Sequence, residues 1–397
     1  MTLTLFYIVQ CNLLNIKLKV LFVLPSKISI TGSSIAVINI MIGLLENNVE
    51  VYVIATKPPK EYEIFLTRLE KKGAKLFIIS SEKSGYRYWK LLASNAMEIM
   101  KKFDIPLIHL HLPKLMYFLG NDLKKMKKKI VFTVEGDPIY EVKKLGFITR
   151  WKTNRMWKKS LSYADYVCPC SNWLKDLIVK RDKVKKIFTV HNSIDIEKFQ
   201  NPNKISKNEL NVSEKDFVVM TAARLTLVKD IETLLKGFSL FVKKGKKNSS
   251  LIILGDGELK EKLIDMTKKL KIENLVNFVG FKNNPQDFIA SADVFVMTSK
   301  YEPFGMPAAE AGCMKIPTIV SKAGGMMEII VHGKTGFQFN IGDQNELALY
   351  LDQLYNDKEM RMNFARNANE HISSNFAPKV ISQKFIKIYQ ELIQTSN

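Results

Sequence analysis

Two carboxylates with seven residues between them are the first feature of this sequence that could do chemistry. Glu302 and Glu310 lie in the segment 299–310, which is rich in Gly, Pro and Ala. Carboxylates accept hydrogen bonds, so both side chains could hold the hydroxyls of a ribose or a sugar. The alternative interpretation is that they are two exposed acids in an ordinary connection between a strand and a helix.

The elements that must position these carboxylates are a strand before them and a helix around the second one. The apolar run 292–297 predicts a buried strand, and Pro307 with the alanines after it predicts the start of a helix. Backbone N–H groups from Gly305 to about Ala308 would then be unpaired at the helix N-terminus. The helix dipole makes such a place suitable for an anion such as phosphate.

Two cations follow the strand predicted at 217–222. Arg224 and Lys229 lie in the stretch Ala-Ala-Arg-Leu-Thr-Leu-Val-Lys-Asp, and parallel sheets bind ligands at the carboxyl ends of their strands. Two cations at that edge suit a diphosphate, which develops negative charge when it leaves. Two solvated surface cations are the alternative, although their place in one loop favours the binding interpretation.

Glycines follow two further predicted strands at the same edge of the sheet. Gly255 and Gly257 come between a strand and a helix, and Gly280 follows the next strand. Glycine lets the backbone come close to a ligand. A lone Gly-x-Gly pair is a weak signal, so these residues support the site only together with the cations.

The N-terminal half contains polar residues at the ends of two predicted strands. His109 and His111 are two apart on one strand and face the same way, but no third ligand for a metal ion is near them. We therefore expect His109 to be packed in the sheet and His111 to face a cleft. Glu135 and Asp137 follow the next strand. Glu135 either accepts a hydrogen bond from an acceptor hydroxyl or only caps a turn.

Strands and helices alternate along both halves of the chain, which predicts parallel, right-handed, doubly wound sheets. In the first half we expect strands at 19–25, 49–55, 75–79, 106–111, 129–134, 165–169 and 186–190, and helices at 35–46, 61–72, 86–102, 114–127 and 148–162. In the second half we expect strands at 217–222, 250–254, 275–279, 292–297 and 316–321, and helices at 231–243, 258–270, 344–356, 358–372 and 377–393.

A polar stretch interrupts this alternation at 191–213 and predicts a domain boundary. We expect one domain at 17–195 and another at 214–376. Residues 1–16 are apolar without the basic start of a signal peptide, and Lys17 ends the run short of the roughly 20 residues that span a membrane. We expect them to be a short tail or a start-codon artefact rather than an anchor.

Composition limits the classes of protein that remain. The chain has 397 residues and a net charge of +21, which favours anionic partners such as nucleotides, nucleic acid or an acidic membrane. Four scattered cysteines do not make a disulfide framework, and we interpret them as thiols of a reducing cytosol.

Glu302 and Glu310 in this context resemble the Glu-x7-Glu signature of the retaining family-4-type glycosyltransferases. The similarity runs from about Lys17 to the C-terminus and is strongest over residues 217–340. It implies the α/β fold called GT-B, in which two Rossmann-like domains face each other across a cleft. It also implies that the C-terminal helix, about 377–397, packs back on the first domain.

The resemblance implies roles for individual residues. The catalytic residues would be Arg224, Lys229 and Glu302. The donor would be bound by Gly32, Gly255, Gly257, Gly280, Thr298, Phe304, Gly305, Met306 and Glu310. The acceptor side would contain His111, Glu135 and Asp137. Many relatives have a histidine at the position of Glu135, so this chain departs from the family on the acceptor side.

The implied reaction moves a sugar from a nucleotide-diphosphate sugar to a glycan, a lipid-linked or a small-molecule acceptor, with retention of anomeric configuration. Protein cations would neutralise the leaving diphosphate, so we expect no metal and no other cofactor. We expect a role in the synthesis of cell-surface polysaccharide or glycolipid. The base of the nucleotide is left open between uridine, guanosine and adenosine.

Basic residues cluster in three N-terminal stretches, at 86–90, 124–129 and 150–159, and aromatic residues are interleaved with them in the first and the last. Such stretches are typical of a surface that meets an anionic membrane, and a solvated basic face is the alternative. We therefore expect a cytoplasmic protein that can lie at the inner face of the membrane. Two other functions stay open: a non-catalytic nucleic-acid-binding protein, for which no recognisable module is present, and a sugar phosphorylase or regulator on the same fold.

Overall fold

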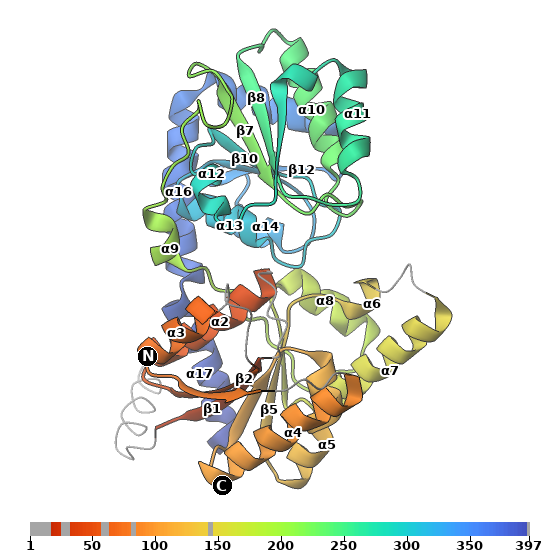
Figure 1. Cartoon of the computed structure of the whole chain (residues 1–397), viewed down its shortest axis with the longest axis vertical. Helices are drawn as coiled ribbons and strands as arrows, with labels where there is room; N and C mark the ends of the chain where they lie inside the picture. Colours follow the sequence, from red (N-terminus) through yellow and green to blue (C-terminus); the bar gives the residue numbers. More distant parts are fainter. Residues whose placement is uncertain (1–16, 25–31, 57–62, 81–84, 142–145, 395–397) are drawn as a thin grey trace. The chain divides into compact units, whose positions relative to one another are not determined.

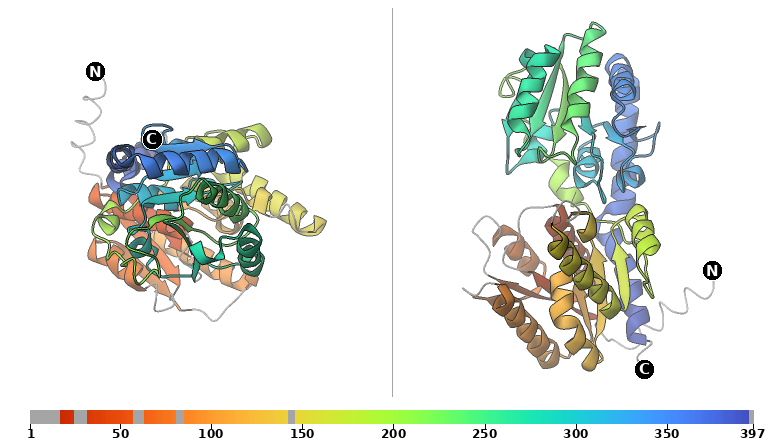
Figure 2. Two further views of the ribbon diagram at one scale, coloured as in Figure 1. Left: turned by 90° about the horizontal axis from the view of Figure 1, so that it is seen from above. Right: turned by 90° about the vertical axis from the view of Figure 1, so that its right-hand side faces the viewer.

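The computed structural model describes residues 17–24, 32–56, 63–80, 85–141 and 146–394 in two compact units. The first unit contains the described residues up to Pro169, then Ile178–Val190, and the chain from Pro378 onward. The second unit contains Cys170–Leu177 and His191–Ala377. Figures 1 and 2 show a parallel sheet with helices on it in each unit. The domain limits predicted from the sequence stay a prediction.

The first unit is built on a six-stranded parallel sheet with the order β3-β2-β1-β4-β5-β6. Its strands are β1 (Lys19–Leu24), β2 (Glu50–Thr56), β3 (Lys75–Ile79), β4 (Leu107–Leu110), β5 (Lys129–Val134) and β6 (Tyr166–Pro169). The central strands are continuous apolar runs because helices cover both of their faces.

The helices of the first unit are α2 (Gly32–Glu46), α3 (Glu63–Lys71), α4 (Gly85–Lys102), α5 (Pro113–Lys125), α6 (Pro138–Glu141), α7 (Phe147–Tyr163) and α17 (Pro378–Gln394). Helix α8 (Asn172–Arg181) begins in the second unit and ends in the first. α4 packs on β1 and β2, whereas α2 and α17 pack on each other over the core on the opposite face.

The C-terminal helix α17 is an integral part of the first unit. Ile381, Phe385 and Tyr389 are buried in the same core as β1 and β2. The α2–α17 contact is close: a Cβ placed on Gly43 of α2 would lie 2.1 Å from the carbonyl oxygen of Pro378. Asn47 donates a hydrogen bond of 2.8 Å to the Ser382 hydroxyl across the same contact.

The second unit repeats the architecture with a sheet of order β12-β11-β10-β7-β8-β9. Its strands are β7 (Phe217–Ala222), β8 (Ser249–Leu254), β9 (Val276–Gly280), β10 (Val294–Met297), β11 (Thr318–Ser321) and β12 (Gly336–Phe339). Its helices are α9 (Ile196–Gln200), α10 (Ile231–Lys243), α11 (Lys260–Leu270), α12 (Pro285–Ile289), α13 (Met306–Cys313), α14 (Met326–Ile329), α15 (Gln344–Asn356) and α16 (Lys358–Phe376), with a short 3₁₀ turn, η2 (Glu273–Leu275).

Two parallel, doubly wound sheets confirm the predicted fold class, but several elements differ from the prediction, among them the short helices α6, α9, α12 and α14, which were not predicted. The strand predicted at 186–190 is wrong: only a single bridge between Val167 and Ile187 forms there, and Phe188 is half exposed. Strand β12 and helix α8 were not predicted. β12 is four residues long and begins at Gly336, which hides it from a search for apolar runs.

Candidate functional site

An ion pair joins two of the predicted residues at the edge of the second sheet. Lys229 lies between β7 and α10, and Glu302 lies between β10 and α13. Lys229 Nζ donates to Glu302 Oε2 at 2.5 Å, and both side chains are partly exposed, 26% and 13%. β7 and β10 are parallel neighbours, so the loops after them meet at the carboxyl edge, where parallel sheets bind ligands.

Thr298 links the loop after β10 to the loop after β7. Its hydroxyl donates at 3.0 Å to the backbone carbonyls of Lys229 and Asp230, and its side chain is buried. The backbone N–H of Lys300 donates to Val228 O at 2.8 Å. The predicted contact of Thr298 with a donor is therefore indirect here, since its hydroxyl proton is used to position Lys229.

Arg224 is the second predicted cation at this edge. Its side chain is exposed, and among the described residues no hydrogen-bond or ion-pair partner of it is present. The backbone beside it is fixed, because Leu225 N–H donates to Asp256 O at 2.9 Å. An arginine whose backbone is fixed and whose guanidinium remains available can bind an anionic ligand.

Gly255 and Gly257 are required by the packing of the loop that contains Arg224. A Cβ on Gly255 would lie 2.0 Å from Ala223 O, and one on Gly257 would lie 2.5 Å from Leu225 O. Gly255 also has φ of +122°, which favours glycine. Its N–H donates to Gly280 O at 2.8 Å, so the three predicted glycines link the ends of β7, β8 and β9.

Helix α13 begins one residue earlier than the sequence predicted. Gly305 is the N-cap with φ of +109°, and Pro307 occupies the first turn. The N–H of Ala308 donates to Gly305 O at 3.0 Å, which corrects the expectation that it is unpaired. The Gly305 position has little free space, since an added Cβ would lie 2.7 Å from Met326 Cγ.

Two predicted donor-binding residues have buried side chains. Phe304 is 2% exposed and lies in an aromatic cluster with His191 and Phe376. Met306 is 7% exposed. Only the backbone of these residues is therefore available to a ligand, and their side chains support the start of α13.

Glu310 is the unpaired carboxylate of the site. It lies in the second turn of α13, partly buried, and among the described residues no hydrogen bond or ion pair of its side chain is present. Burial raises the pKa of Glu310 to about 7, and the charge of Lys198 opposes this shift. A partner with hydroxyl or cationic groups would therefore stabilise its ionised form.

Glu328 is a further residue of this edge that the sequence analysis did not single out. Its carboxylate accepts from the N–H groups of Asn172 and Trp173, at 3.0 and 2.9 Å, and from His191 Nε2 at 2.8 Å. Burial acts to raise the pKa of Glu328, but the hydrogen bond from His191 and those from the backbone outweigh it, so the pKa is lowered.

The turn before Glu328 supports the loop that contains Glu302. A Cβ on Gly324 would lie 2.0 Å from Glu302 O, and one on Gly325 would lie 2.3 Å from Pro303 O. Gly325 N–H also donates to Glu302 O at 2.9 Å. The turn thus holds the backbone of Glu302 in place.

In the first unit, the predicted residues at the strand ends are neutral or already paired. His109 is fully buried between the hydroxyls of Tyr389 and Thr133, each at 2.5 Å. His111 stacks on Phe22 and on His109, with ring centroids 5.7 and 4.5 Å apart. Burial lowers the pKa of His111 to about 3, and both of its ring nitrogens are buried without a hydrogen-bond partner.

Asp137 has a structural role. Its carboxylate is 3% exposed, accepts from Arg181 Nη1 at 2.6 Å and accepts from Ile139 N–H at 3.0 Å. Glu135 lies two residues before it, partly buried, directly after β5. Gly32 is the first residue of α2. The structure thus places Gly32, His111, Glu135 and Asp137 in the first unit and the other predicted residues in the second.

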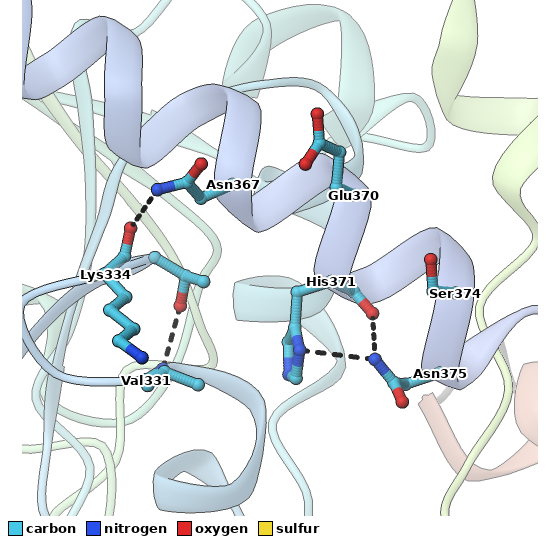
Figure 3. Close-up of a pocket in the computed structure, with 8 residues that line it drawn as sticks. Val331, Lys334, Asn367, Glu370, His371, Ser374 and Asn375 are labelled. Carbon is cyan, nitrogen blue, oxygen red and sulfur yellow. Dashed lines mark hydrogen bonds between the residues drawn. The ribbon is translucent and has the colours of Figure 1, made fainter.

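A hollow of about 480 Å³ opens on the second unit away from these residues. Figure 3 shows it between α16 and the loop before β12. Asn367 donates to Lys334 O at 3.0 Å, and Asn375 donates to His371 O at 2.8 Å. None of the predicted site residues lines it.

Within the described ranges, no group of three or more His, Cys, Asp and Glu side chains could hold a metal ion. The helices in the same ranges are all too short or too polar to span a membrane.

Two family models match the chain, one in each half. Residues 202–371 match the model described as Glycosyl transferases group 1, and residues 30–198 match Glycosyltransferase Family 4. Together the two matches include most of both sheets and the whole 299–310 segment.

Curated relatives and a solved structure agree with these matches. The chain is similar to N-acetyl-alpha-D-glucosaminyl L-malate synthase of Bacillus anthracis, 26% identical over 76% of this chain and 79% of the relative. It is also similar to alpha-monoglucosyldiacylglycerol synthase of Acholeplasma laidlawii, 26% identical over 93% and 95% of the two chains. The crystal structure of Anabaena HepE in complex with UDP shares the fold, with a TM-score of 0.75, 20% identity and coverage of 94% and 100%.

Proposed function

Because the chain belongs to the glycosyltransferase group 1 family and has the GT-B fold, we propose that it is a retaining transferase that uses a nucleotide-diphosphate sugar. The acceptor is a glycan, a lipid-linked or a small-molecule hydroxyl. In the reaction, the bond between the sugar C1 and the diphosphate oxygen breaks. A bond forms between C1 and the acceptor oxygen on the same face of the sugar, and the hydroxyl proton passes to the leaving diphosphate.

The observation that carries this proposal is the set of charges at the carboxyl edge of the second sheet. Arg224 is exposed, Lys229 is a second cation in the same loop, and neither Arg224 nor the Glu310 carboxylate has a partner within the described part of the chain. In our proposal the two cations bind the diphosphate and stabilise the charge that develops on it. Glu310 accepts hydrogen bonds from the ribose, and Glu302, held by Lys229, lies at the sugar.

The Lys229–Glu302 pair has a specific use in this proposal. A lysine that is already bonded to a carboxylate has a fixed position, so little side-chain entropy is lost when the diphosphate arrives. The carboxylate is fixed by the same bond and can accept from a sugar hydroxyl with its other oxygen. Since these protein cations do the neutralising, we propose that the reaction needs no divalent metal ion.

On the acceptor side, the proposal gives His111 and Glu135 the task of holding the acceptor hydroxyl. A neutral imidazole with two unpartnered nitrogens can donate one hydrogen bond and accept another. The relatives act on acceptors as different as malate and diacylglycerol, to judge from their names. We propose a cytoplasmic enzyme of surface polysaccharide or glycolipid synthesis that can lie at the inner face of the membrane.

A donor screen tests the proposal directly. The protein is mixed with UDP-, GDP- and ADP-sugars, and the melting temperature and the release of nucleoside diphosphate are measured. A true donor must raise the melting temperature, because it binds only the folded state. With an acceptor present, the anomeric proton coupling of the product reports retention or inversion. EDTA is expected to leave the rate unchanged.

Two results would overturn the proposal. The first is that no nucleotide sugar raises the melting temperature or releases its diphosphate. The second is phosphate-dependent release of a sugar 1-phosphate from a glycan, which would make the protein a phosphorylase.

A further inference from the structure

Helix α7 has an exposed apolar end that the proposed reaction does not use. Phe147, Ile148 and Trp151 are 79%, 67% and 51% exposed, respectively. Positions 147 and 151 are four apart on the helix, and 148 and 151 are three apart, so the three side chains form one patch on the first two turns. Single exposed apolar residues are ordinary, but a contiguous apolar patch at a helix end marks an interaction surface.

The other end of α7 is firmly anchored. Trp157 is fully buried, and its indole N–H donates to Asp182 Oδ2 at 2.9 Å. Ser160 Oγ donates to Pro113 O at 2.9 Å. A Cβ on Gly120 of α5 would lie 2.2 Å from the Tyr163 ring, so the two helices touch closely. Figures 1 and 2 show that the first turns of α7 project from the body of the first unit.

The charged residues of α7 itself all have the same sign. Between Phe147 and Tyr163 there are five cations and no Asp or Glu; the cations are Arg150, Lys152, Arg155, Lys158 and Lys159. Arg155 lies over the Trp151 ring, 5.6 Å from its centroid. All five cationic side chains are exposed. A helix with an apolar end and only basic charged residues is complementary to the interface of an anionic bilayer.

The other two basic stretches differ from α7 in ways that the sequence did not show. In the stretch 124–129, three lysines lie within 4.0 Å of an acidic side chain: Lys124 with Asp165, Lys125 with Asp122, and Lys128 with Asp104.

In the stretch 86–90, Tyr88 is buried, and Tyr86, although exposed, lies edge-on against Phe118. Of the three basic stretches, only the described residues of α7 combine several exposed apolar side chains with unopposed positive charge.

We propose that the first two turns of α7 are a membrane-docking element, in which Phe147, Ile148 and Trp151 enter the interface of an anionic lipid bilayer and the surrounding cations bind the headgroups. Docking would bring the enzyme to a lipid-linked acceptor, and this purpose rests on the proposed function. The docking itself does not depend on that function. The aliphatic Ile148 favours a bilayer over nucleic acid, because it has no ring to stack on a base.

Vesicle flotation tests the proposal with the full-length protein. Wild type is expected to float with phosphatidylglycerol–phosphatidylcholine vesicles and to remain unbound with pure phosphatidylcholine. The triple variant Phe147→Ser, Ile148→Ser, Trp151→Ser should lower the partition coefficient roughly tenfold or more, since three apolar side chains no longer leave water. A matched control is Phe281→Ser, Ile341→Ser, Met362→Ser, which removes three apolar side chains of the second unit that are 67%, 46% and 56% exposed.

Fluorescence shows whether the tip enters the bilayer. Trp151 emission should shift to shorter wavelength on vesicle binding, and Trp151→Phe should abolish the shift while binding persists. Equal flotation of wild type and the triple variant would overturn the proposal. So would retention on heparin or single-stranded RNA in place of anionic vesicles.

Nucleoside diphosphate release from a soluble donor is measured on the same variants. We expect it to be unchanged, so a failure of membrane docking is distinguishable from a failure of the proposed catalytic function.

Discussion

The two units have the same sheet architecture, but they use the carboxyl ends of their strands differently. In the second unit, this edge presents Arg224 and Glu310, which have no partner in the ranges that the structure describes, and Lys229, whose partner Glu302 a ligand can share. In the first unit, the corresponding polar groups are neutral by burial, as His111 is, or bonded within the fold, as Asp137 is to Arg181.

This difference shows where binding energy for a charged ligand can come from. A diphosphate needs cations that are fixed in position and still have N–H donors with which to bind it. A neutral hydroxyl needs only hydrogen-bonding groups in a place from which water is largely excluded. The second unit suits the first kind of ligand and the first unit suits the second kind, which gives each unit its own half of the proposed reaction.

The largest expected effect comes from the two cations. Arg224→Ala and Lys229→Ala should each lower kcat/KM about 10²- to 10³-fold, because charge on the leaving diphosphate is no longer stabilised. The two variants should differ in stability. Arg224 has no partner among the described residues, so its removal should leave the melting temperature unchanged. Lys229→Ala leaves the Glu302 carboxylate without its cationic partner and should lower the melting temperature. Full activity of both variants would refute the assignment.

The second effect tests the structural role of Asp137 in the first unit. Asp137→Ala removes a buried carboxylate that is bonded to Arg181 and to Ile139 N–H, and should cost about 2–3 kcal/mol in the free energy of unfolding by urea. Glu135→Gln is the comparison variant and should change stability much less. If Asp137→Ala were as stable as wild type and lost acceptor affinity instead, Asp137 would belong to the acceptor site.

The third effect concerns Glu310 and has a defined pH dependence. Its pKa in the folded protein, about 7, is raised above the ordinary 4.5, so the folded state binds more protons than the unfolded state between these values. Stability from this group is therefore lost as pH rises toward and through 7. Glu310→Gln should raise the melting temperature by a few degrees at pH 8 and leave it nearly unchanged at pH 5.

Donor affinity should show the opposite trend, since ribose hydroxyls donate to the ionised carboxylate. A nucleotide sugar, which has no titrating phosphate in this range, should bind more tightly at pH 8 than at pH 6, by up to roughly tenfold. Glu310→Gln should remove this pH dependence. If the affinity of Glu310→Gln for the donor still depended on pH in this way, Glu310 would not be the group that binds the ribose.

The smallest effect is an expected absence of change at His111. Since burial lowers its pKa to about 3, its ring proton signals should stay constant in an NMR titration from pH 8 to pH 5, with the signals assigned from a His111→Asn variant. A mid-point near 6.5 would show that water reaches the ring, and the contrast between the two units would then weaken.

Much of this molecule follows from local patterns in the sequence. The continuous apolar strands, such as β1, β7 and β8, and the long helices α10 and α15 can be read directly, because burial on both faces and helical periodicity are local properties. The Glu302–Glu310 spacing, the cations after β7 and the glycines after β8 could be placed at one sheet edge, since parallel strands deliver their carboxyl ends to the same side.

Only the tertiary structure decided which of these polar groups are free. Asp137 and Arg224 are both polar residues just after a strand, yet Asp137 is ion-paired with Arg181, whereas Arg224 has no partner among the residues that the structure describes. Glu328 gained its role from Asn172, Trp173 and His191, which are more than a hundred residues away in the chain. Hydrogen bonding and desolvation depend on neighbours that sequence patterns do not reveal, and these neighbours determine the charge state and availability of each group.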